Sequence, residues 1–198
     1  MTMKSRASRY GDFVEHPRHG KGPRLTGLDV FDTPDGRVYC HWHSPPGVRV
    51  PNTAVPADVA RQAPATIPVT HYFDVRRVCR KCGRPFLFFA EEQKYWYEDL
   101  RFPLEADCLE CVPCRKDEQQ LRLIRRKYDA LRAETVRTEA DTLELVACGL
   151  VLVESSVFSK RILPKLRGVL KPLLANREGP SYTQAQALVS RINGVAAR

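Results

Sequence analysis

The chain has 198 residues, 43% of them hydrophobic, and a net charge of +9, so it suits one or two small domains with a modest core. Its first residues lack the apolar run of a signal peptide, and its longest apolar run, Leu143 to Val153, is too short to cross a bilayer; we therefore expect a cytoplasmic protein with reduced cysteines and no membrane partner. The positive charge permits attraction to nucleic acid without establishing it.

Residues 1–70 lack the pattern of a regular domain. Residues 1–30 hold few large apolar side chains, so we expect this basic segment to be disordered. Residues 31–70 hold seven of the fifteen prolines, which remove backbone donors and fix φ, so an irregular segment is expected there.

The Pro-rich segment contains a second group of potential metal ligands, Cys40-His41-Trp42-His43. Imidazole and thiolate are suitable ligand types. However, adjacent residues of a strand point to opposite faces, and no paired ligand spacing is present. We therefore favour histidines that are hydrogen-bonded against the neighbouring domain over a second metal site.

Regular structure is predicted from Tyr72 onwards. The runs 72–78 and 85–90 are rich in β-branched and aromatic residues and predict the two strands of a hairpin. Glu91 and Glu92 then supply the negative charge that favours a helix start, ahead of a helix over 93–100.

Two Cys-x-x-Cys pairs are the most informative feature of the chain: Cys79 with Cys82, and Cys111 with Cys114. Four thiolates are a ligand set that tetrahedral zinc prefers, and two intervening residues let each pair close on one ion. We predict one structural Zn²⁺ in a domain over 71–117. A catalytic zinc needs an open coordination position, which four cysteines do not leave, and the sequence offers no other catalytic motif or small-molecule substrate site, so we expect no enzyme.

The residues around the cysteines also occur in a specific order. They are Asp74, Cys79-Arg-Lys-Cys82, Phe86, Phe88, Ala90, Glu92, Gln93, Tyr95 and Cys111-Val-Pro-Cys114-Arg115. This order resembles the bacterial probable zinc-ribbon domain family over about residues 70–117. The resemblance implies a four-cysteine zinc ribbon, built from a β-hairpin and a short helix, and implies no reaction.

Cys108 makes the ligand assignment ambiguous, because Cys108-Leu-Glu-Cys111 is a further Cys-x-x-Cys pair. We choose Cys111 and Cys114, since Arg115 follows them as a basic residue follows the last ligand in the family. Cys108 is then expected to be a buried apolar residue. It remains an alternate ligand, and a redox-responsive or zinc-responsive role for it is the functional alternative.

Aromatic residues are dense around the first cysteine pair. They could stack on exposed bases, as in single-strand binders. Because a small zinc domain has little aliphatic core, Phe86, Phe88 and Trp96 are expected to pack around the site instead.

The region 118–198 is predicted to be helical. Apolar residues at spacings of three and four predict a helix over 116–138, and an Asn193-Gly194 stop is expected at the end of the last helix. Pro164 and Pro172 should break or kink the third helix. The remaining predicted helices cover 139–154, 158–176 and 181–193.

Basic residues accompany the first of these helices: Arg115, Lys116, Arg122, Arg125 and Arg126. They are candidate contacts to nucleic-acid phosphates. Some also stand four residues from an acidic residue, which fits an ordinary salt-bridged solvent face. A second basic group consists of Lys160, Arg161, Lys165, Arg167 and Lys171.

The sequence thus predicts an α+β protein with an irregular N-terminal region, a small zinc ribbon and a helical C-terminal region. The expected function is binding, with nucleic acid slightly preferred as partner. A protein–protein adaptor with structural zinc is the first alternative.

Overall fold

A computed structural model describes residues 9–29 and 38–197. The chain forms two compact units, with the boundary after Arg115. None of the helices in the described ranges combines the length and the apolar character needed to span a bilayer. The secondary structure is α+β, with small antiparallel sheets in the first unit and helices in the second.

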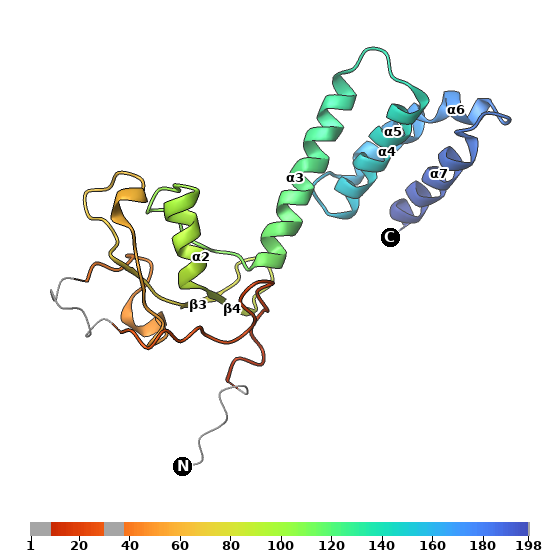
Figure 1. The fold of residues 1–198 in the computed structure, drawn as a ribbon. Helices are drawn as coiled ribbons and strands as arrows, with labels where there is room; N and C mark the ends of the chain where they lie inside the picture. Colours follow the sequence, from red (N-terminus) through yellow and green to blue (C-terminus); the bar gives the residue numbers. More distant parts are fainter. Residues whose placement is uncertain (1–8, 30–37, 198) are drawn as a thin grey trace. The chain divides into compact units, whose positions relative to one another are not determined.

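The first unit is built on a hairpin of β3 (Val75–Val78) and β4 (Pro85–Phe88) (Figure 1). The register runs from Val75 opposite Phe88 to Val78 opposite Pro85, so the turn begins at Cys79. A second pair of strands, β1 (Val55–Pro56) and β2 (His71–Tyr72), is also antiparallel. The hairpin was predicted from the sequence and is present.

A short helix follows the hairpin, as the two glutamates predicted. It consists of α2 (Ala90–Lys94) and one turn of π-helix, η4 (Tyr95–Asp99). Tyr97 is fully buried in the η4 turn. The wider π turn, in which backbone bonds reach five residues back, ends where Leu100 N–H donates to Tyr95 O at 3.0 Å.

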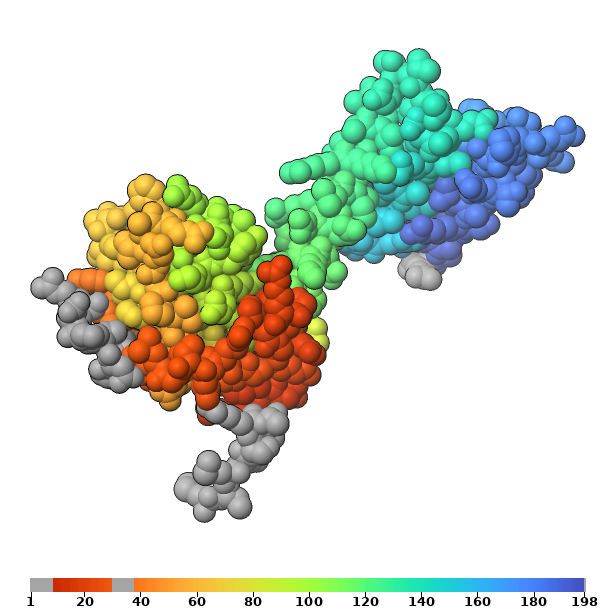
Figure 2. Space-filling view, viewed as in Figure 1, coloured from red at the N-terminus to blue at the C-terminus, as the bar shows by residue number. Residues whose placement is uncertain are grey.

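Residues 9–29 are ordered against the hairpin, which corrects the expectation of disorder for this part of 1–30. Val14 N–H donates to Pro85 O at 2.8 Å, and Tyr10 packs with Leu87 and Phe89. Figure 2 shows this segment, in red, lying against the rest of the unit. The few apolar residues of this segment pack on a sheet that the rest of the unit forms. The prediction of disorder considered only the composition of the segment itself. Residues 1–8 and 30 lie outside the described residues.

In its described part, residues 38–70, the Pro-rich segment contains only short pieces of regular structure, as expected. They are β1 and two 3₁₀ turns, η2 (Pro46–Val48) and η3 (Val59–Arg61). Extended pieces still add to the sheets: Arg49 bridges Val75, and Cys40 bridges His71. Thr53 is buried, and its hydroxyl donates to Val50 O at 2.7 Å, which fixes the turn that follows Val50. The part of this segment at 31–37 lies outside the described residues.

The second unit consists of helices, and the capped second helix matches its prediction. Helix α4 (Glu139–Glu154) begins at a capping box, in which Thr138 and Asp141 bond to each other's backbone. The helix that precedes it, α3, begins earlier and ends earlier than predicted. The bounds of the others are α3 (Val112–Ala133), η5 (Lys160–Ile162), α5 (Leu163–Val169), α6 (Lys171–Ala175) and α7 (Tyr182–Ala197).

The core of the second unit surrounds α4. Val146, Leu150 and Leu152 in this helix have no measurable exposure, and they pack with residues of the other helices. The predicted third helix is divided into η5, α5 and α6, because Pro164 and Pro172 each occupy the first turn of a new helix. Proline is tolerated there, since a first-turn N–H has no intrahelical partner.

The predicted stop at Asn193-Gly194 is wrong. Helix α7 continues to Ala197, and Gly194 has no positive φ. Ile192 is 3% exposed, and Val195 packs against the same core. Packing of one apolar face therefore carries the helix past the glycine.

We expect Gly194→Ala to increase the free energy of unfolding by about 0.5–1 kcal/mol, because alanine is the better helix former and loses less entropy. A Cβ at this position meets no atom within 4 Å. If the helix ended here with a left-handed glycine, the substitution would destabilise instead. Chemical denaturation followed by circular dichroism measures the change.

Gly149→Ala is the matched control for that measurement. A Cβ at Gly149 in α4 would lie 2.8 Å from Leu166 Cδ2 and 3.1 Å from Tyr128 Cε2. The same chemical change should therefore destabilise the protein, by about 1–3 kcal/mol, through overpacking.

Candidate metal centre

Four cysteine sulfurs converge in the first unit. The Sγ atoms of Cys79, Cys82, Cys111 and Cys114 all lie within 4.8 Å of one another. Cys82 Sγ and Cys111 Sγ are 3.8 Å apart. Zinc–sulfur bonds of about 2.3 Å in a tetrahedron require sulfurs about 3.8 Å apart. The donor set and its spacing therefore fit a tetrahedral zinc ion.

The first pair is positioned by the hairpin turn. Cys79 N–H donates to Arg84 O, and Gly83 N–H donates to Cys79 O, both at 2.9 Å. Gly83 has φ +70°, in the left-handed region that glycine occupies without strain. This tight turn points both thiols of the pair to the same side.

The second pair lies at the start of α3. Cys111 precedes the helix, and its carbonyl accepts the first helical bond, from Arg115 N–H at 3.0 Å. Cys114 is in the first turn, where the helix dipole favours a thiolate. The two pairs also contact each other directly, because Cys111 N–H donates to Cys79 Sγ at 3.4 Å.

The electrostatics of the four thiols call for a cation. Burial would raise the pKa of Cys79, but N–H donors led by that of Cys111 lower it to about 6. Burial and the neighbouring cysteines raise the pKa of Cys114, and burial raises that of Cys111. The Arg84 N–H group lowers the pKa of Cys82 as well. Two of the four thiols therefore ionise readily, and the other two do so only if a bound cation offsets their charge.

Comparison with known families agrees with this geometry. Residues 73–122 match the family of probable treble clef domains. No curated protein and no solved structure matches the chain. The treble clef domain is a zinc-binding domain with a four-cysteine site.

The match confirms the predicted four-cysteine domain and refines its description. The resemblance implied a zinc ribbon over about residues 70–117, and the apolar spacing predicted a helix that begins at residue 116. In the treble clef domain the second cysteine pair instead belongs to the start of that helix, α3. The metal site therefore joins the hairpin to the first turn of a 22-residue helix.

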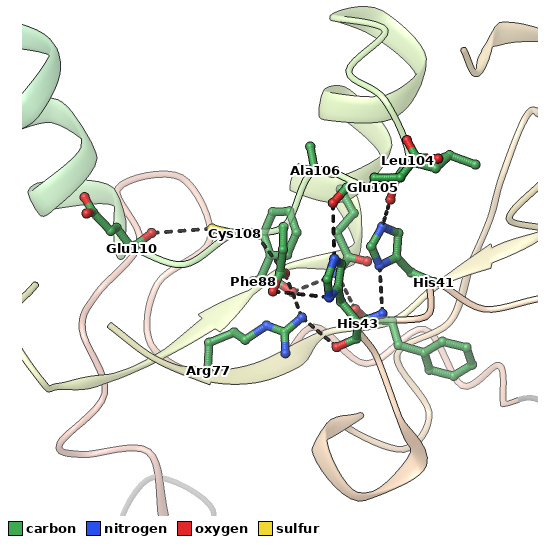
Figure 3. Close-up of polar contacts among 12 residues, drawn as sticks. His41, His43, Arg77, Phe88, Leu104, Glu105, Ala106, Cys108 and Glu110 are labelled. Carbon is green, nitrogen blue, oxygen red and sulfur yellow. Dashed lines mark hydrogen bonds and ion pairs between the residues drawn. The ribbon is translucent and has the colours of Figure 1, made fainter. Parts of the chain in front are cut away.

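Cys108 lies outside the group of four. Its side chain is buried, with 1% exposure, and its thiol donates to Glu110 O at 3.4 Å (Figure 3). Burial raises the pKa of Cys108 to about 12. The position has the features expected of a buried apolar residue.

The loop that carries Cys108 is held by an ionic cluster that sequence reasoning missed. Arg77 on β3 donates to Asp107 Oδ1 at 2.8 Å and to His43 O at 2.6 Å. Asp107 also accepts the Cys108 N–H at 2.8 Å. Figure 3 shows Arg77 between the segment that carries His43 and the loop that carries Cys108. This cluster fixes the chain just before the second cysteine pair.

The histidines of the Pro-rich segment are used in hydrogen bonds. His41 is buried, its Nε2 pairs with Leu104 O, and its Nδ1 accepts from His43 N–H at 3.2 Å. His43 Nε2 pairs with Glu105 O at 3.1 Å (Figure 3). Within the described residues the four cysteines form the only cluster suited to a metal. The hydrogen bonds expected for these histidines are present.

Polar residues of the family motif connect the site to the rest of the unit. Gln93 donates to Phe73 O at 2.5 Å and to Phe88 O at 3.0 Å. Glu92 accepts from Arg115 on α3 at 2.5 Å and lies 3.5 Å from His16 Nε2. The sequence motif had singled out Glu92 and Gln93, but it did not indicate which residues they bond to.

Asp74 connects the N-terminal segment to α2. Its Oδ2 accepts the Arg24 N–H at 2.7 Å, and its Oδ1 accepts the Ala90 N–H at 2.8 Å. The side chain is 1% exposed. A single buried carboxyl group therefore holds two segments that are far apart in the sequence.

The aromatic residues pack as predicted. Phe86 and Phe88 are 3% and 2% exposed and contact the buried cysteines, and Trp96 packs on the same cluster. Arg115 lies over the Trp96 ring, 4.8 Å from its centroid. Phe86 and Phe88 are therefore part of the core around the site, and Trp96 is half-buried against it with Arg115 over its ring.

The candidate phosphate contacts of α3 differ in their surroundings. Arg115 is held by Glu92 and Trp96. Arg122 pairs with Glu118, and Arg125 pairs with Asp129 at 2.8 Å. Lys116 and Arg126 are exposed.

We expect Cys111→Ser to lose the bound zinc, while Cys108→Ser retains one zinc per chain. Serine removes a thiolate ligand in the first case, whereas in the second its hydroxyl can still donate to the Glu110 carbonyl. Elemental analysis of the purified proteins measures the metal. Equal loss of zinc from both variants would contradict the ligand assignment.

Asp74 should give a measurable pH dependence. Burial raises its pKa to about 6, although the Ala90 and Arg24 N–H groups act in the opposite direction. The folded state therefore binds a proton that the unfolded state, with a carboxyl pKa of about 3.9, releases. This contribution to stability is complete below pH 4 and is lost as the pH rises through 6, with a size of roughly 3 kcal/mol.

Asp74→Asn does not titrate, so the stability of wild type relative to this variant should fall between pH 4 and pH 7. Denaturation of both zinc-loaded proteins at several pH values measures the difference in the free energy of unfolding. Both proteins contain the same four cysteines, so the effect of acid on the metal site cancels in this difference. A difference that is constant with pH would contradict the assignment.

Proposed function

We propose that this protein is a non-catalytic binding protein, in which one structural zinc ion fixes the treble clef domain and the helical unit binds nucleic acid. Four cysteines fill the coordination shell of zinc and leave no position for a water or a substrate. Zinc would supply folding free energy to a small domain and hold the hairpin to the first turn of α3.

The distribution of charge carries the choice of nucleic acid. Residues 116–198 contain 15 lysines and arginines against 9 aspartates and glutamates, so two thirds of the net charge of +9 belongs to the helical unit. On α3 the basic side chains Lys116, Arg122, Arg125 and Arg126 are all exposed. A basic helix of this kind supports sequence-independent contacts to phosphates.

The ion pairs on α3 do not oppose this proposal. Arg122 and Arg125 pair with acidic residues four positions away on an exposed helix face, and such pairs contribute about 0–1 kcal/mol. A phosphate can therefore replace the carboxylate at little cost. Arg115 is different, because its pairing with Glu92 is partly buried, so we assign it a structural role.

A redox role for Cys108 receives no support from its surroundings. Sensor cysteines are exposed and have a low pKa, whereas Cys108 is 1% exposed and its pKa is raised to about 12 by burial. A protein–protein adaptor is the alternative that the binding experiment tests.

We expect the zinc-loaded protein to bind a labelled DNA or RNA oligonucleotide, and the variant Arg122→Ala/Arg125→Ala/Arg126→Ala to bind at least tenfold more weakly. Loss of three phosphate contacts should lower the slope of log K against log salt by about 3 on duplex DNA. Fluorescence anisotropy over a range of salt measures both quantities. Alanine favours helix, so α3 should be retained.

The matched control replaces three exposed arginines of the first unit, Arg9, Arg18 and Arg80, by alanine. It changes the net charge equally and should change binding little. Equal weakening by both triple variants would show an effect of total charge rather than a surface on α3. Absence of all binding at physiological salt would overturn the nucleic-acid proposal and favour a protein partner.

A further inference from the structure

The helical unit contains a pocket that neither the zinc site nor the proposed phosphate contacts use. Its volume is about 460 Å³, and it lies between the C-terminal half of α3, the η5 turn and α5. Pockets for small molecules have volumes of about 300–1,000 Å³. Its apolar floor consists of Tyr128, Leu145, Phe158, Ile162, Leu166 and Val169.

The floor is a fixed surface. Tyr128 and Phe158 contact each other edge to face, with ring centroids 5.1 Å apart. Leu145 and Leu166 belong to the buried core, at 3% and 2% exposure. Arg125 lies over the Phe158 ring, 4.6 Å from its centroid. An apolar group that entered the pocket would meet side chains already held in place by the core.

The remaining lining residues are basic or neutral. Arg132, Arg161 and Lys165 line the pocket and are exposed, and no acidic residue lines it. Arg137 also lines it, but its guanidinium is already used at the end of α3, where it donates to Leu131 O at 3.1 Å and Glu134 O at 2.9 Å. The three other cations have no acidic partner among the described residues.

We propose that this pocket binds a small amphiphilic anion, a carboxylate or phosphate that carries an apolar chain or ring. The apolar part lies against Phe158 and Leu166, and the anionic group is held at the rim by Arg132, Arg161 and Lys165. Guanidinium groups bind carboxylates and phosphates through paired, charge-assisted hydrogen bonds. Apolar burial and charge pairing thus select the same class of ligand.

Octanoate is the probe that separates the two parts of this proposal. We expect it to shift the amide resonances of residues that line the pocket, in spectra of the full zinc-loaded chain. 1-Octanol, which has the apolar chain without the charge, and acetate, which has the charge without the chain, should each bind at least tenfold more weakly. Equal affinity for octanoate and octanol would overturn the proposal.

Two neighbouring residues supply a matched pair of variants. Arg161 lines the pocket, whereas Lys160 belongs to the same η5 turn and does not line it, and both are exposed. Arg161→Glu should weaken octanoate binding about tenfold or more, the effect expected of losing a charge-assisted hydrogen bond. Lys160→Glu makes the same charge change and should leave the affinity within about twofold. Equal effects of the two variants would overturn the site.

The octanoate titration contains no nucleic acid, so this proposal can hold or fail independently of the proposed nucleic-acid binding. A vesicle arm identifies the source of the ligand. We expect vesicles that contain phosphatidylglycerol to bind the pocket with lower affinity than free octanoate does. Arg161-dependent binding to those vesicles, with no response to free octanoate, would overturn a soluble ligand in favour of a membrane surface.

Discussion

The convergence of four thiols is the constraint on which the rest of the first unit depends. The hairpin turn is tight, and α3 begins at the cysteine pair, so the metal site is where the sheet meets a helix. Neither element buries enough apolar surface alone, since the aromatic cluster around the cysteines is small. The apolar residues of the first unit are divided among three small clusters, so a metal ion bound to all four sulfurs would hold the hairpin and the helix together.

A second level of organisation surrounds the site and uses buried polar groups. Asp74 and Gln93 each bond to backbone groups of segments that are distant in the sequence, and Asp107 accepts from the side chain of Arg77 on β3. Buried polar groups must be paired, because an unpaired one costs as much as several apolar contacts supply. These bonds therefore specify one arrangement of chain segments that are otherwise irregular, including residues 9–29.

The two units differ in how they obtain stability. The first combines three small apolar clusters with ion pairs, backbone bonds and a four-cysteine site that fits a metal ion. The second is a helical core of leucines and valines around α4. Its apolar face is satisfied internally, which leaves the basic residues on the outside. This division is the basis on which we propose binding to anions, either phosphates along α3 or an amphiphilic anion in the pocket.

The sequence by itself predicted the four cysteines with Cys108 as an alternate ligand, the hairpin, the α4 helix and the breaks at Pro164 and Pro172, because cysteine spacing, strand pattern, apolar content and proline act over a few residues. Tertiary structure decided the order of residues 9–29, the continuation of α7 past Gly194 and the start of α3 at the metal site. In each of these cases a contact with a distant segment outweighs the local preference. The pocket also depends on such contacts, since Phe158, Arg132 and Arg161 come together only when the helices pack.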